Sequence, residues 1–149
     1  MYKHILIPSD GSELSQKAVA HGIELAAALD ARVTALTVTI PYHSLELDPA
    51  PVADIPGAAD FVREYLHGRP KLYLEAVETA ARVKGVTCET LQIEHDHPYV
   101  AIIETAQAKG CDLIVMASHG RSGLSAIVLG SETVKVLTHT KIPVLVHRS

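Results

Sequence analysis

Short apolar segments alternate with longer segments of helical periodicity along this chain. Five segments of five to eight residues are apolar, or alternate between apolar and polar positions, as β-strands do. The predicted strands span His4–Pro8, Arg32–Thr39, Val86–Ile93, Cys111–Met116 and Ile142–His147. Within the fourth strand, Leu113 to Met116 is apolar without interruption, which predicts a strand buried on both faces of a sheet.

Helical segments follow the first four strands. Ser12 and Ser131 are suitable N-cap residues, Pro70 and Pro98 suit a first helical turn, and Gly85 and Gly110 suit helix ends. The predicted helices run from Ser12 to about Leu29, Phe61 to His67, Pro70 to Lys84, Pro98 to Gly110 and Glu132 to His139. Pro41 to Gly57 holds four of the eight prolines and predicts a long irregular loop, a kind of segment that is often functional.

This order of strands and helices predicts an α/β fold, with a doubly wound, five-stranded parallel sheet and right-handed helical crossovers. Only six of the 149 residues are aromatic, so Val, Ile, Leu and Ala must fill the core, as is usual in parallel sheets. The length predicts one domain over residues 1–149.

Charge and composition exclude several classes of function. The formal charge of −4 gives no basic surface for nucleic acid. No apolar run approaches the ~20 residues of a membrane span, and no signal peptide is visible, so we expect a cytoplasmic protein without membrane contact. Cys88 and Cys111 both lie in predicted strands, which favours free thiols over a disulfide.

The chemistry is concentrated after the fourth strand. Ala117-Ser118-His119-Gly120 is followed by nine residues and then by Gly130-Ser131, where the last helix begins. Glycine lets backbone N–H groups close around an anion, and a helix N-terminus adds N–H groups and a partial charge of roughly +0.5. This loop therefore predicts a phosphate-binding site.

The spacing Gly-x2-Gly-x9-Gly-Ser resembles the nucleotide loop of the ATP-binding branch of the universal stress protein family. The similarity extends from Lys3–Ser12 to Pro143–Val146, and Ile114–Leu124 is very typical of it. In one departure, Ala117 stands where the family has its first glycine. An alanine is tolerated there if the position is still extended at the end of the strand.

The resemblance implies a Rossmann-like fold that binds adenine nucleotides, with strand order 3-2-1-4-5. ATP, with Mg²⁺ or Mn²⁺ able to bridge its phosphates, would lie across the carboxyl ends of strands 1 and 4. Asp10 and the main chain from Val38 to Ile40 would contact the adenosine, and Gly120, Gly130 and Ser131 would present donors to the phosphates. The full implied site comprises Pro8, Ser9, Asp10, Val38, Ile40, Met116, Ala117, Ser118, His119, Gly120, Arg121, Gly130, Ser131 and Glu132.

For two of these residues, the sequence also allows a structural role without ligand contact. Arg121 is either a phosphate ligand or a solvated surface residue, and His119 is interpreted as a packing residue of the loop. The pair His95 and His97 has metal-ligand spacing, but no further ligands follow, and Pro98 identifies this segment as a helix entry.

Other functions remain open or are excluded by motif. A Rossmann dinucleotide site and a P-loop both need glycine patterns that this chain lacks, and a receiver domain needs an acidic pair where Asp10 stands alone. A nucleotide-free interaction module of the same fold is an alternative, and Ala117 favours it. A slow nucleotide hydrolase is a further alternative, although no general base or nucleophile with a partner is evident.

The last predicted strand, Ile142–His147, is strongly apolar, yet the implied order places it at a sheet edge. Such edges are usually covered or paired in soluble proteins. Both this argument and the resemblance imply a homodimer formed through this strand, with Val144 and Val146 antiparallel to their counterparts.

Overall fold

The computed structural model describes residues 1–41, 54–120 and 129–148. Its centre is a five-stranded sheet, parallel throughout, with the order β3-β2-β1-β4-β5. The predicted α/β fold and strand order are therefore confirmed. The strands are β1 (His4–Pro8), β2 (Arg32–Thr39), β3 (Cys88–Glu94), β4 (Leu113–Ala117) and β5 (Val144–His147).

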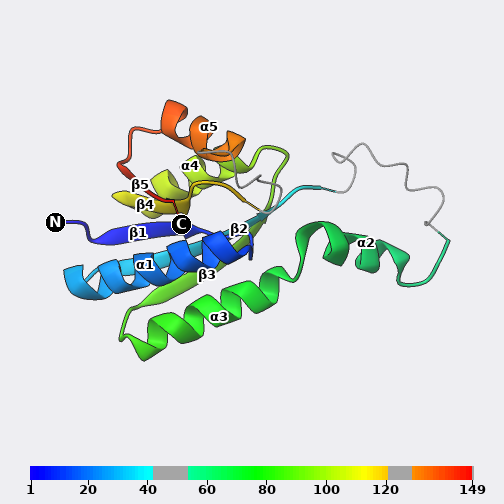
Figure 1. Cartoon of the computed structure of the whole chain (residues 1–149), viewed down its shortest axis with the longest axis horizontal. Helices are drawn as coiled ribbons and strands as arrows, with labels where there is room; N and C mark the ends of the chain where they lie inside the picture. The colour runs from blue at the N-terminus through cyan, green and yellow to red at the C-terminus, as the bar shows by residue number, and fades with distance from the viewer. Residues whose placement is uncertain (42–53, 121–128, 149) are drawn as a thin grey trace.

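Helices cover both faces of the sheet (Figure 1). The helices are α1 (Glu13–Leu29), α2 (Ala58–His67), α3 (Pro70–Val83), α4 (Pro98–Lys109) and α5 (Ser131–His139). α1 and α3 lie on one face, α4 and α5 lie on the other, and α2 stands out to the side of the sheet. The structure thus has three layers, with α2 as an appendage.

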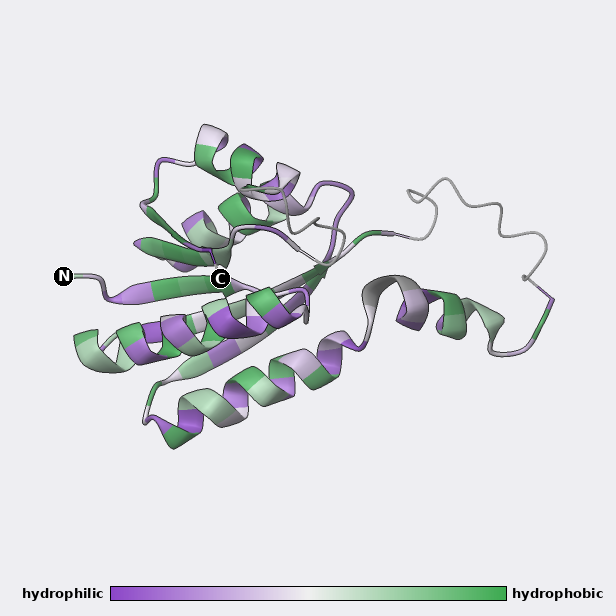
Figure 2. Ribbon diagram, in the orientation of Figure 1, coloured by the Kyte–Doolittle hydropathy of each residue, from purple (hydrophilic) through white to green (hydrophobic). Residues whose placement is uncertain are grey.

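Each face of the sheet has its own apolar core. Ile5, Ile7 and Val115 pack under α1 and α3, whereas Leu6 and Ile114 pack under α4 and α5. These side chains are divided between the two cores because alternate residues of a strand point to opposite faces. All five are fully buried. Figure 2 shows hydrophobic residues along the central strands and alternating character along α1 and α3.

Local chemistry explains most of the element ends. Ser12 caps α1 as predicted, since its hydroxyl accepts the Ser15 N–H at 3.2 Å. Gly110 ends α4 in the left-handed conformation, with a φ of 70°. The predicted N-cap at Ser131 is wrong, because α5 begins at Ser131 itself and Gly130 is the capping residue.

Several predicted boundaries move by one to three residues. α2 begins at Ala58 rather than Phe61, β3 at Cys88 rather than Val86, and β4 at Leu113 rather than Cys111. β5 begins at Val144, since Pro143 has no N–H for the ladder. Most of the predicted loop from Pro41 to Gly57 lies outside the described residues.

The two cysteines are free thiols in different settings. Cys111 is buried just before β4, and Cys88 is half-buried in β3. Burial raises the pKa of each thiol to about 11. Both are therefore protonated and unreactive near neutral pH. Across the described residues, no helix is both long and apolar enough to cross a membrane.

Candidate functional site

Most of the predicted site lies at the carboxyl ends of β1 and β4. Asp10 follows β1, and Gly120 lies three residues after β4. A Cβ atom built on Gly120 would lie 2.4 Å from Oδ2 of Asp10, so the carboxylate packs directly against this glycine. Residues separated by more than a hundred positions thus meet at the topological switch point, where open α/β sheets bind ligands.

A network of short-range hydrogen bonds fixes the turn after β1. Oδ1 of Asp10 accepts the Ser12 N–H at 3.0 Å, which holds the carboxylate at the start of α1. The buried Ser9 hydroxyl contacts the Ser15 hydroxyl at 3.1 Å and accepts the Gly11 N–H at 3.3 Å. Ser9 therefore shapes the turn through its side chain, and Asp10 is the acidic group that the turn presents.

Ala117 is accommodated at the position where the resemblance implies a glycine. It is the last residue of β4 and pairs with His147 of β5, so its backbone is extended. Its carbonyl accepts the Thr133 hydroxyl at 2.9 Å. The condition under which alanine would be tolerated here is met.

The two described ends of the glycine loop are joined to each other. The Gly130 N–H donates to the Ser118 carbonyl at 2.6 Å, and the Ser118 N–H donates to His147 at 2.8 Å. A Cβ atom on Gly130 would lie 3.1 Å from Cα of His119 and 3.3 Å from the Ser118 oxygen. In this structure the Ser118 carbonyl therefore accepts the Gly130 N–H, and that Gly130 presents this group to a phosphate stays a prediction.

The N-terminus of α5 points its donors toward the same end of the sheet. Gly130 is extended at a φ of −73°, and none of the described side chains caps the helix there. The first N–H groups of a helix have no intrahelical partner, and they carry a partial positive charge. Ser131 is exposed at this first position, so its N–H and hydroxyl replace Gly130 as the donors available to an anion.

Comparison with known proteins shows which family this fold belongs to. The family model of the universal stress protein family matches residues 1–148. The chain belongs to the universal stress protein family. It is 36% identical over 148 residues to the universal stress protein MJ0531 of Methanocaldococcus jannaschii, covering 98% of this chain and 82% of that protein. It is 31% identical to YxiE of Bacillus subtilis, covering 99% and 100% of the two chains.

Solved structures of universal stress proteins have the same fold. The hypothetical protein MJ0577 of M. jannaschii superposes with a TM-score of 0.79 at 26% identity, covering 100% of this chain and 97% of that one. A universal stress protein crystallised in complex with cAMP superposes with a TM-score of 0.72 at 25% identity, covering 99% of both chains. The latter protein is thus an adenine-nucleotide complex in this family.

The remaining residues of the predicted site have three different outcomes. Pro8, Met116 and the buried Ser118 belong to the ends of β1 and β4, close to the Asp10–Gly120 contact. His119 is a loop residue whose Nδ1 lies 3.4 Å from the Gly120 carbonyl, in keeping with its interpretation as a packing residue. Arg121 lies outside the described residues.

The Glu132 side chain is bonded to α4 and to its own helix. Its Oε2 accepts the Tyr99 N–H at the start of α4 at 2.9 Å, and its Oε1 faces Lys135 at 3.4 Å. The carboxylate therefore connects α5 to α4, and only the Glu132 main chain belongs to the donors at the α5 N-terminus. The His95 ring likewise has a local role, because its Nδ1 accepts the His97 N–H at 2.9 Å at the entry to α4.

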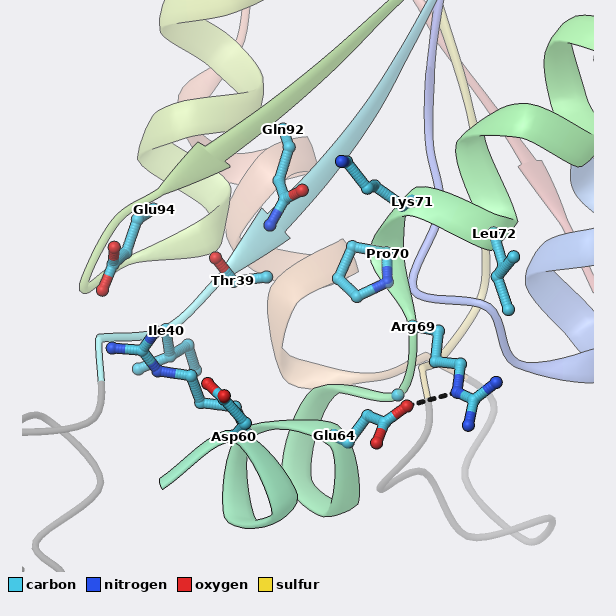
Figure 3. A pocket seen from close by; sticks show the side chains of 12 residues that line it. Thr39, Ile40, Asp60, Glu64, Arg69, Pro70, Lys71, Leu72, Gln92 and Glu94 are labelled. Carbon is cyan, nitrogen blue, oxygen red and sulfur yellow. Dashed lines mark hydrogen bonds and ion pairs between the residues drawn. The ribbon is translucent and has the colours of Figure 1, made fainter. Parts of the chain in front are cut away.

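Val38 and Ile40 lie at the same carboxyl end of the sheet, at the end of β2 next to β1. Val38 packs against the α4 side of the core, whereas Ile40 lines a separate cavity of about 530 Å³, here called the elbow pocket. This pocket lies between the ends of β2 and β3 and the bend that joins α2 to α3 (Figure 3). It is lined by Thr39, Ile40, Asp60, Arg63, Glu64, Gly68, Arg69, Pro70, Lys71, Leu72, Gln92 and Glu94.

Two further residues position the site, and the sequence did not reveal them. Thr133 is buried in the first turn of α5, where its hydroxyl bonds to the end of β4. Tyr73 of α3 lies with its ring against Gly11, and its hydroxyl accepts the Arg69 N–H at 2.9 Å. For Thr133, its place at the third position of the helix is the one local sequence signal of this role. The contact of Tyr73 with Gly11 has no local sequence signal.

Proposed function

We propose that this chain is an ATP-binding regulatory protein of the universal stress type, with the nucleotide held across the ends of β1 and β4. The observation that carries the proposal is the packing of the Asp10 carboxylate against Gly120. This contact lies at the carboxyl end of the sheet, where the α5 N-terminus also presents its donors. A carboxylate suits an adenine amino group or a ribose hydroxyl, and helix N–H groups suit phosphate oxygens. The cAMP complex of a relative supports an adenine nucleotide as ligand.

Within this proposal, Asp10 and the main chain from Val38 to Ile40 contact the adenosine. The phosphates lie against Gly120 and the Ser131 N–H and hydroxyl, and Mg²⁺ or Mn²⁺ accompanies them. The site keeps its space because any side chain at Gly120 would displace the Asp10 carboxylate. Ala117 does not weaken the proposal, since it is extended within β4.

The proposed role is binding rather than rapid turnover. Donors that hold phosphates explain affinity but do not activate a water molecule, and the described loop ends offer no carboxylate besides Asp10 and Glu132. The Glu132 carboxylate is bonded to Tyr99. We therefore expect phosphate release far below the enzyme median of about 10 per second.

A titration of thermal stability tests the proposal. ATP with Mg²⁺ at a hundred times its dissociation constant should add about 2.7 kcal/mol to the free energy of unfolding. Tripolyphosphate is the matched probe, because it offers the phosphates without adenosine, and it should stabilise the protein less. Gly130→Val should abolish the effect, since its side chain would press on His119 and Ser118 and displace the loop.

A mass spectrum of the ligand released from purified protein gives a second readout. An adenine nucleotide in that spectrum agrees with the proposal. If neither the spectrum nor millimolar ATP gives a signal, the chain is instead a nucleotide-free interaction module.

We also propose that two chains pair through β5. This strand is at the edge of the sheet, and its four residues are partly exposed. The carbonyls of Pro143 and His147 accept N–H groups of the β4 side, at Ile114 and Ser118. Because main-chain groups alternate along a strand, those of Val144 and Val146 point outward, where an antiparallel copy can bond to them.

A further inference from the structure

The elbow pocket has a character that the nucleotide proposal does not use. It lies over β2 and β3, whereas the Gly120 loop follows β4, two strands from β2 in the sheet order. Of the proposed nucleotide site it shares only Thr39 and Ile40, at the end of β2. Its volume of about 530 Å³ falls within the range of small-molecule sites, about 300–1,000 Å³. A cavity of this size therefore has room for a ligand of its own.

The floor of the elbow pocket becomes polar where the cover of α3 ends. On the face of β2 under α3, Val33 and Ala35 are buried against Leu74 and Val77. Further along, Thr37 is still buried, and its hydroxyl donates to the Ser9 carbonyl. Thr39, which pairs in register with Glu94 of β3, lines the pocket together with Glu94 and Gln92. α3 begins at Pro70, so this polar end of the sheet is left open to the pocket (Figure 3). The floor thus suits a ligand that forms hydrogen bonds rather than an apolar one.

The walls of the elbow pocket carry equal numbers of opposite charges. Arg63, Arg69 and Lys71 are cationic, and Asp60, Glu64 and Glu94 are anionic. Arg69 and Glu64 form an ion pair with each other across the bend between α2 and α3. The other four charges form no ion pair within the described part of the chain, and they come from α2, α3 and β3.

This balance restricts the chemistry of the occupant. A ligand with several negative charges, such as a second triphosphate, would meet the carboxylates of Asp60 and Glu94, and a polycation would meet Arg63 and Lys71. A molecule with one charge of each sign can pair with both sets at once. Gln92 lies between Lys71 and Glu94 in Figure 3, and its amide can donate and accept in the centre of such a ligand.

We propose that the elbow pocket binds a small zwitterion of the free amino acid type. The ligand's carboxylate pairs with the Lys71 side of the pocket, and its ammonium group pairs with the Glu94 side. Thr39 and Gln92 form hydrogen bonds with its polar side chain. This site borders the proposed nucleotide site at Thr39 and Ile40, but its charged groups, Lys71 and Glu94, lie outside that site, so the zwitterion can bind without ATP.

The experiment compares three probes by amide NMR titration of the full chain without nucleotide. L-Glutamine carries both charges, N-acetyl-L-glutamine lacks the ammonium group, and L-glutamine methyl ester lacks the carboxylate. We expect L-glutamine to shift the amide signals of Thr39, Gln92 and Gly68. We also expect it to bind at least about tenfold more tightly than either analogue.

Two variants assign the charges. Lys71→Met should reduce the affinity for L-glutamine to that for the ester, and Glu94→Gln should reduce it to that for the acetylated probe. Lys141→Met and Glu104→Gln, at exposed positions that do not line the pocket, are the matched controls and should keep the wild-type affinity.

The proposal is overturned if about 10 mM L-glutamine leaves the pocket signals unchanged. It is equally overturned if all three probes bind alike, or if both pocket variants keep the wild-type affinity. Because nucleotide is absent from the titration, failure of the ATP proposal would not alter any of these outcomes.

Discussion

The Asp10 carboxylate lies against the α-carbon of Gly120, although the two are 110 positions apart in the sequence. This contact joins the turn after β1 to the loop after β4, and it leaves no space for a side chain at position 120. Gly120 has no positive φ, so its glycine is required for space rather than for backbone conformation.

Gly120→Ala should therefore impair the nucleotide site without unfolding the protein. The added Cβ would lie 2.4 Å from Oδ2 of Asp10, and the carboxylate can rotate away because it is the end of a side chain. We expect ATP affinity to fall by about tenfold, equivalent to about 1.4 kcal/mol. Calorimetric titration of both proteins measures the difference.

Gly85→Ala is the control with the opposite result. Gly85 has a φ of +71° and open space around its Cβ position, so alanine there costs about 1–2 kcal/mol of stability through its backbone alone. Its ATP affinity should stay unchanged. Equal ATP affinities of Gly120→Ala and wild type would contradict the role given to this contact.

Gly11→Ala should destabilise the fold more than Gly85→Ala does. Both glycines have a positive φ, but a Cβ on Gly11 would lie 2.2–2.5 Å from ring atoms of Tyr73. The alanine must therefore displace the ring that holds α3 against the turn after β1. Urea denaturation of the two variants separates the backbone cost, which they share, from the Tyr73 contact.

A double mutant provides the check on this contact. Tyr73→Ala in the Gly11→Ala background removes the clash, so the pair should cost less than the sum of the two single changes. Additive costs would show that Tyr73 does not restrict position 11.

Folding stability should decrease below neutral pH because of His4. Its Nε2 lies 2.7 Å from the Thr34 hydroxyl, and its side chain is buried at the amino end of β1. Burial, assisted by the nearby Arg32, lowers the pKa of His4 below its ordinary value of 6.5. Below pH 6.5 the unfolded chain therefore binds more protons than the folded one, and stability falls with decreasing pH until the folded-state pKa is passed.

Urea denaturation at several pH values between about 7.5 and 5 measures this slope. This pH range includes the ordinary pKa of histidine. His4→Gln should flatten it, whereas His139→Gln, at an exposed position on α5, should leave it unchanged. An identical slope in wild type and His4→Gln would contradict the assignment.

Val146→Pro should separate the proposed dimer. Proline removes the N–H that points outward from β5, while the carbonyls that bond to β4 belong to Pro143 and His147. Val146→Thr keeps the N–H and the branched side chain, and it should remain a dimer. Sedimentation velocity at micromolar protein distinguishes the two, and a monomeric wild type or a dimeric Val146→Pro would refute the pairing through β5.

The sequence predicted the strands and helices well because their signals are local. The uninterrupted apolar run at Leu113–Met116 and the caps at Ser12 and Gly110 depend on neighbouring residues alone. The strand order came from family resemblance, since periodicity does not say which strands are neighbours.

Contacts between distant segments account for what the sequence did not predict. The bond from Gly130 to Ser118 occupies an N–H that the glycine pattern assigned to phosphate, and Tyr73 reaches Gly11 across 62 positions. The Glu132 carboxylate likewise turns to Tyr99, a residue of another helix. None of these pairings leaves a periodic trace in the chain.

The most direct test of the central claim is an amide NMR titration with ATP and Mg²⁺. The account predicts that the signals of Asp10, Gly120 and Ser131 shift together and saturate with one affinity. The signals near His4, at the opposite, amino end of β1, should stay in place. Unchanged signals at these three residues with millimolar ATP, or shifts confined to another part of the chain, would contradict it.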